Sequence, residues 1–175
     1  MEPLITLVAV TAILLGAGAL GIRILRPWPV AVRGGLAAMF TLTGVVHFVG
    51  MRQRLVEMVP PALPNPELLV TITGVLELAG AVGLLLPRTA RWAAGGLTVL
   101  LVAMFPANVH AALEGTDTPL LPRTLMQLLF LAATLAVVVS SRRGGRRSAA
   151  GGTRADAAPE HRTPDAQDAR AVRAY

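Results

Sequence analysis

The stretch that decides the fold is residues 68–86, LLVTITGVLELAGAVGLLL, which is apolar except for Glu77 near its centre. A helix needs about 20 apolar residues to cross a bilayer, so this stretch predicts a membrane-spanning helix. A carboxylate at that depth is unstable unless water or a polar partner reaches it. Gly74, Glu77 and Ala81 share one helix face, and small residues there let neighbouring helices approach closely. We therefore expect Glu77 to face other helices.

The composition of the whole chain supports a membrane protein. Of its 175 residues, 54% are hydrophobic and 15% are charged, and a soluble domain of this size cannot bury so much apolar surface. There is no Cys, which excludes disulfides and thiolate metal sites. The net charge of +6 comes from Arg residues at segment ends and in the C-terminal tail, so we expect no nucleic-acid partner. No glycine-rich phosphate loop is present, which excludes a nucleotide-binding enzyme.

Four further apolar segments cover residues 4–22, 34–50, 92–113 and 124–139. The first follows Glu2 and no basic residue, which is wrong for a signal peptide, so we expect a retained membrane helix. The sequence thus predicts an all-α, polytopic membrane helix bundle. The tail, residues 141–175, is rich in Gly, Ala, Pro, Arg and Asp, and we expect it to be disordered.

Prolines mark the connections between these segments. Pro27 and Pro29 are expected to break the chain before residues 34–50. Between residues 51 and 65, one or two amphipathic turns are expected. The prolines that follow at 60, 61, 64 and 66 should then prevent the helix from continuing.

The distribution of Arg residues predicts the topology. With the N-terminus outside, nine Arg residues near segment ends lie on the cytoplasmic side and three lie outside, as the positive-inside rule favours. We therefore predict a multi-pass protein of the cell membrane with a cytoplasmic, Arg-rich tail. This topology places His47, Glu77, Asn108, Gln127 and His110 in the outer half of the membrane.

These five residues are our candidates for ligand binding or proton exchange. Asn108 and His110 differ by about 200° around a helix, so both cannot face one centre. We favour Asn108 as the inward residue, and we expect a helix kink at Pro106, which lacks a backbone donor. We also expect Glu77 to form a hydrogen bond with at least one of His47, Asn108 and Gln127.

Four short motifs resemble, in this order, the DoxX family of small integral membrane proteins: GVVHF at 44–48, MVPPALP at 58–64, GVLELAG at 74–80 and FPAN at 105–108. The resemblance implies a four-helix core over residues 33–140, with residues 1–32 as an additional N-terminal helix and its connection. It also implies a redox-associated membrane subunit, since some relatives accompany sulfur-compound oxidation and quinone reduction. It transfers no catalytic residue, and any enzymatic role would be that of an oxidoreductase-associated subunit.

The leading hypothesis is a quinone-sized pocket in which His47 and Glu77 bond to a ligand head group while Asn108 and Gln127 orient it. Alternatives remain open: a structural network tying the helices together, a non-catalytic assembly partner in the membrane, and a small proton-linked carrier. A metal site of His47, His110 and Glu77 ranks lower because no HExxH-like spacing is present, so we expect no metal. The expected partners are the lipid bilayer, a membrane or redox protein and a second copy of the chain.

Overall fold

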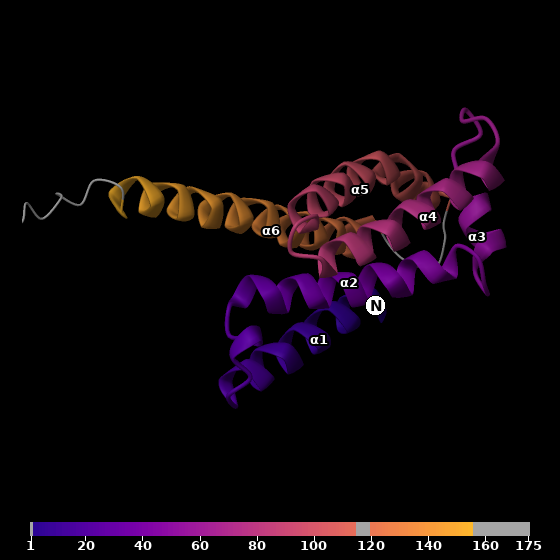
Figure 1. Cartoon of the computed structure of the whole chain (residues 1–175). Coiled ribbons are helices and arrows are strands. Elements are labelled where there is room, and N and C mark those ends of the chain that lie inside the picture. The colour runs from indigo at the N-terminus through magenta and orange to yellow at the C-terminus, as the bar shows by residue number, and fades with distance from the viewer. Residues whose placement is uncertain (1, 115–119, 156–175) are drawn as a thin grey trace, which may run out of the picture. The chain divides into compact units, whose positions relative to one another are not determined.

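A computed structural model describes residues 2–114 and 120–155 of the chain, and within these ranges its regular secondary structure is helical, with no strand. The elements are α1 (Glu2–Ala19), the 3-10 helix η1 (Arg23–Leu25), α2 (Trp28–Val46), α3 (Arg52–Glu57), α4 (Pro66–Leu85), α5 (Ala90–Leu113) and α6 (Leu120–Ala155), as Figure 1 shows. In the described part, five helices, α1, α2, α4, α5 and α6, are long and apolar enough to cross a membrane. The predicted all-helical architecture with five long apolar segments is confirmed.

The chain divides into two units, residues 1–143 and 144–175, and the packing described below belongs to the first. Helix α6 continues to Ala155, past residue 141, where we expected disorder to begin. Residues 156–175 of the expected tail lie outside the described residues.

Helix α2 lies between α1 and α4 (Figure 1), and its neighbours approach it at glycines. A β-carbon on Gly35 would clash with Thr11 of α1, and one on Gly44 would lie 2.9 Å from Leu78 of α4. Helices α4 and α5 meet in the same way where Gly80 faces Leu97. Because glycine has no side chain, the helices can approach each other closely at these positions, as is common between membrane helices.

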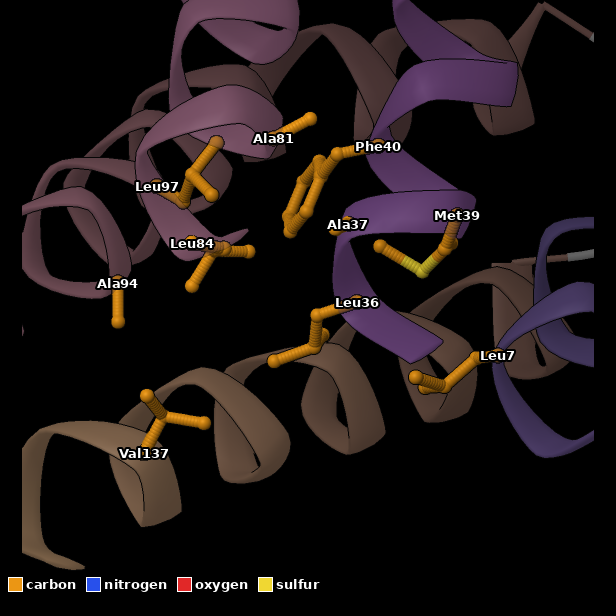
Figure 2. Packing of buried hydrophobic residues seen from close by; sticks show 10 residues of the cluster. All are labelled: Leu7, Leu36, Ala37, Met39, Phe40, Ala81, Leu84, Ala94, Leu97 and Val137. Atoms are coloured by element: carbon orange, nitrogen blue, oxygen red, sulfur yellow. The ribbon is translucent and has the colours of Figure 1, made fainter. Parts of the chain in front are cut away.

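The centre of this unit is a cluster of apolar side chains from five helices. Figure 2 shows Leu36 and Phe40 of α2 beside residues of α4, α5 and α6. Leu36, Leu84 and Val137 are fully buried there. By contrast, large apolar side chains cover the outside of the long helices; Leu85 is 61% exposed and Val99 69% exposed. A helix that presents such side chains outward is suited to lipid contact.

Two helices begin earlier than the sequence suggested. Helix α2 starts at Trp28, so Pro29 lies in its first turn and does not precede it. Helix α4 starts at Pro66. Proline is tolerated in the first turn because the backbone N–H that it lacks has no acceptor within the helix there. Our expectation that Pro29 breaks the chain was therefore wrong. Helix α3 ends at Glu57 and does not continue through the prolines, as we expected, and Pro66 is the first residue of α4.

Arg33 joins the start of α2 to the end of α4. Its Nε donates a hydrogen bond to the carbonyl oxygen of Leu84 at 2.8 Å, and its Nη2 donates to that of Leu85 at 3.2 Å. These carbonyls belong to the last turn of α4, where no helical N–H remains to bond them. A cation at a helix C-terminus is also favoured by the helix dipole. Arg33 thus caps α4 and fixes the antiparallel pairing of the two helices.

Candidate ligand-binding cavity

A cavity of about 640 Å³ opens in the first unit where α2 and α5 end and α4 and α6 begin. Ligand sites for small molecules commonly have volumes of about 300–1,000 Å³ and few polar groups in a mainly apolar lining. Side chains of α1, α2, α3, α4, α5 and α6 all reach this cavity. Its polar groups include four of the five predicted site residues: His47, Glu77, Asn108 and Gln127.

Methionine is the most frequent residue type in the apolar lining. The chain contains six Met residues, and every one after Met1 lines the cavity: Met39, Met51, Met58, Met104 and Met126. Methionine has three rotatable bonds and a polarisable sulfur, so it adapts to ligands of different shape. The lining is therefore apolar and deformable.

His47 enters the cavity from the residue that follows α2. Its imidazole is buried, with 4% exposed, and its Nδ1 lies 2.8 Å from the carbonyl oxygen of Thr43. The side chain fits against α4 because Gly74 leaves room for it; a β-carbon on Gly74 would lie 2.5 Å from the His47 Cβ. The imidazole of His47 is therefore fixed by a hydrogen bond to Thr43, and the residue packs against Gly74 of α4.

Glu77 reaches the same cavity from α4, about one helical turn after Gly74. Its carboxyl group is 4% exposed, and Oε2 has no hydrogen-bond partner among the described residues. The polar side chain within hydrogen-bonding reach of the carboxyl group is Thr43. We expected a bond to His47, Asn108 or Gln127, and the described residues show none: depth along the helices brings these side chains to one cavity, but His47 bonds to Thr43, Asn108 to Gln127 and Gln127 to Leu101 instead.

The amides of Asn108 and Gln127 form a bridge between α5 and α6. Asn108 Nδ2 donates to Gln127 Oε1 at 2.8 Å, and Gln127 Nε2 donates to the carbonyl oxygen of Leu101. Leu101 and Asn108 are two turns apart on one face of α5, and Pro106 lies between them inside the helix. Gln127 therefore spans the region where Pro106 removes a backbone hydrogen bond.

His110 does not line the cavity, whereas Asn108 does, which is the arrangement that we favoured. The described residues contain no group of three or more His, Cys, Asp or Glu side chains placed to hold a metal ion. Glu77 lines the cavity, and His110 is not among the residues that line it. The separation of His110 from the cavity follows from the rotation of about 200° between residues 108 and 110.

Arg52 links the residues that follow α2 to the first turns of α4. Its guanidinium donates to the carbonyl oxygen of His47 at 3.2 Å and to the hydroxyl of Thr71 at 3.0 Å. It also donates to the carbonyl oxygen of Glu67 at 3.4 Å. This side chain holds the residues after α2 against the first turns of α4, and so positions His47.

Sequence reasoning missed the methionines and the contribution of α1. Met39, Thr43 and His47 recur at intervals of four, as do Met104 and Asn108, so each pair or triplet shares a helix face. That spacing is the signal that could have found them. By contrast, nothing in the sequence indicated that Glu2 and Pro3 would line the cavity, because this depends on how α1 packs on α2.

The described part of the chain is helical, and five of its helices are long and apolar enough to cross a membrane. Its cavity is lined by methionines and a few polar side chains. Residues 36–144 match the family described as Domain of unknown function (DUF8561), and the match covers more than half of the chain. The chain therefore belongs to this family. The matched range includes most of α2 and all of α4 and α5, and leaves α1 outside. Comparisons with curated proteins and with solved structures found no match.

The family match corrects the resemblance to DoxX, which was wrong. The motifs behind that resemblance are short and consist of small and apolar residues with at most one polar residue each. Membrane helices in general use small residues where they cross and place polar residues inward, so such motifs recur in unrelated families. The redox association and the four-helix DoxX core depended on the resemblance and lose that support.

Proposed function

We propose that this protein is an integral protein of the cell membrane that binds a small amphipathic molecule, with an apolar body and a polar head group, in the methionine-lined cavity. The observation that carries the proposal is Glu77: a carboxyl group that lines the cavity, is 4% exposed and has an unpartnered oxygen among the described residues. An isoprenoid quinone is one molecule of this class.

The energetics of burial support a functional role for Glu77. A buried polar group without a hydrogen bond destabilises a protein by about 1–3 kcal/mol, and an unpaired charge destabilises it more. Residues that serve only stability are rarely left in this state, whereas binding sites keep polar groups that a ligand completes. The Asn108–Gln127 bridge differs in that its hydrogen bonds already tie α5 to α6.

The proposed orientation has the N-terminus outside and the C-terminal end in the cytoplasm. Arg33, Arg88 and Arg91 would then lie at the cytoplasmic ends of α2, α4 and α5, where the positive-inside rule favours them. In this orientation the cavity lies in the outer half of the bilayer. A lipid-soluble ligand would reach it from the membrane, and its apolar body would remain among apolar side chains.

The proposal is tested by extracting the full chain with its surrounding lipid in polymer nanodiscs and identifying bound lipophilic molecules by mass spectrometry. The matched pair of variants is Glu77→Gln and Glu67→Gln, both on α4; Glu67 is exposed and does not line the cavity. We expect a co-purified or added quinone or related lipid to be retained by wild type and Glu67→Gln, and to be lost or weakened in Glu77→Gln. Equal retention by all three proteins, or by none, would overturn the proposal.

A further inference from the structure

The hydrogen bonds around the cavity have a direction, which determines what kind of head group fits. A backbone carbonyl oxygen can only accept a hydrogen bond, so any side-chain nitrogen bonded to it must donate. Two such carbonyls, those of Thr43 and Leu101, hold side chains of the cavity. They therefore determine whether the atoms of these side chains that remain for a ligand are hydrogen-bond donors or acceptors.

The first of these groups is His47. Because its Nδ1 lies 2.8 Å from the carbonyl oxygen of Thr43, Nδ1 carries the proton. A neutral imidazole protonated on Nδ1 has an unprotonated Nε2, which can only accept. Nε2 lies on the side of the ring away from Thr43, and it has no hydrogen bond within the described part of the chain. His47 thus presents an acceptor.

The second group is Asn108, whose orientation is set through Gln127. The Gln127 Nε2 donates to Leu101, so the Gln127 oxygen faces the other way and accepts from Asn108 Nδ2 at 2.8 Å. Asn108 therefore keeps its carbonyl oxygen, Oδ1, as a further acceptor, together with the second N–H of its amide. Reversing either amide would place two oxygens or two N–H groups against each other.

The third group is Glu77 Oε2, which is an acceptor in the carboxylate form. Protonation of Glu77 would turn one oxygen into a donor and would leave the acceptors of His47 and Asn108 unchanged. The lining also contains donors, in the guanidinium of Arg123 and the second N–H of Asn108, whereas Thr43 Oγ1 donates to the carbonyl oxygen of Met39 at 3.2 Å. Acceptors on three residues of the lining, His47, Asn108 and Glu77, therefore call for hydrogen-bond donors on the ligand.

We propose that the ligand of this cavity carries a head group with at least two hydrogen-bond donors, such as a dihydric phenol, and that a head group offering only carbonyl or ether oxygens is rejected. This inference rests on the proposed function, since it concerns the ligand of the same cavity. A site with buried acceptors discriminates strongly against a ligand that leaves them unpaired. For a quinone-like molecule, the reduced dihydroxy form is the one that fits.

A redox-silent pair of probes tests the inference. One is a resorcinol with a decyl chain, and the other is its dimethyl ether, which has the same body but no donor. Binding to the full chain in nanodiscs is measured by displacement or native mass spectrometry. We expect wild type and Glu67→Gln to bind the resorcinol at least about tenfold more tightly, a difference of about 1.4 kcal/mol. Glu77→Gln and His47→Phe should each reduce this ratio.

The outcomes separate the inference from the proposed function. If neither probe binds, and no lipid co-purifies, the cavity is no binding site and both proposals fail. If the two probes bind equally, or the ether binds more tightly, the cavity binds amphipathic molecules but the donor requirement is wrong. If the preference is the same in Glu77→Gln and His47→Phe as in wild type, it arises elsewhere and the assignment of acceptors is overturned.

Discussion

His47 packs directly on Gly74: a β-carbon on Gly74 would lie 2.5 Å from the Cβ of His47. This contact joins the end of α2 to the face of α4 that carries Glu77 one turn later. Gly44 makes the reciprocal contact, since a β-carbon there would lie 3.3 Å from the Cβ of Glu77. His47 and Glu77 therefore each face a glycine of the opposite helix.

The first prediction concerns that contact. Gly74→Ala should lower the stability of the protein by about 1–3 kcal/mol, because the added methyl group forces α2 and α4 apart. Gly95→Ala in α5 is the matched control, because nothing lies within 4 Å of its β-carbon position and the substitution should be neutral or stabilising. Thermal unfolding in detergent measures both. Equal effects of the two variants would show that the close approach at Gly74 does not limit packing.

The second prediction concerns the effect of Glu77 on the stability of the protein. Glu77→Leu should leave the free energy of unfolding unchanged or raise it by about 1–2 kcal/mol, since it removes a buried, unpartnered oxygen and leaves Thr43 with its bond to Met39. The same variant should lose ligand binding. Thermal unfolding and nanodisc binding measure the two effects. A large loss of stability would mean that Glu77 supports the fold.

The third prediction concerns the amide bridge. Gln127→Leu should destabilise the protein by about 1–3 kcal/mol, because it leaves the half-buried Asn108 amide without its partner. In the double variant Asn108→Leu/Gln127→Leu, both amides are replaced by apolar groups, so the combined loss should be smaller than the sum of the single losses. A double-mutant cycle by thermal unfolding measures the coupling. Additive losses would indicate that the two amides act independently.

The fourth prediction concerns the cap on α4. Arg33→Gln should lower stability by about 1–2 kcal/mol, since it removes charge-assisted hydrogen bonds to the carbonyl oxygens of Leu84 and Leu85. Arg88→Gln removes the same charge from an exposed position near the same helix end and should have little effect. The comparison separates capping from general charge effects. If both variants behave alike, the cap contributes nothing.

The fifth prediction concerns topology, and the absence of Cys makes it simple to test, because an introduced Cys is the only thiol in the chain. Ala62→Cys, between α3 and α4, should react with a membrane-impermeant maleimide in intact cells. Leu20→Cys, between α1 and α2, is 91% exposed in the protein but should react only after the cells are opened. The reverse pattern would invert the proposed orientation.

The sequence predicted the long helices well, because uninterrupted apolar runs leave few alternatives. It failed at the start of α2, where Pro29 was taken as a breaker although a first turn accepts proline. For the site, depth along each helix was enough to gather His47, Glu77, Asn108 and Gln127 at one cavity. Which of them bond to each other depends on helix rotation to within a fraction of a turn, and apolar patterning on lipid-facing helices does not encode it.

The methionine lining gives the protein a built-in set of spectroscopic reporters. Every Met after Met1 lies on the cavity wall. Met39 is on α2, Met51 and Met58 flank α3, Met104 is on α5 and Met126 is on α6. In a sample labelled with ¹³C at the methionine methyl groups, all internal resonances therefore originate from the wall of one chamber. Changes of their chemical shifts on adding a compound would map which helices it touches, with no mutation and no tag.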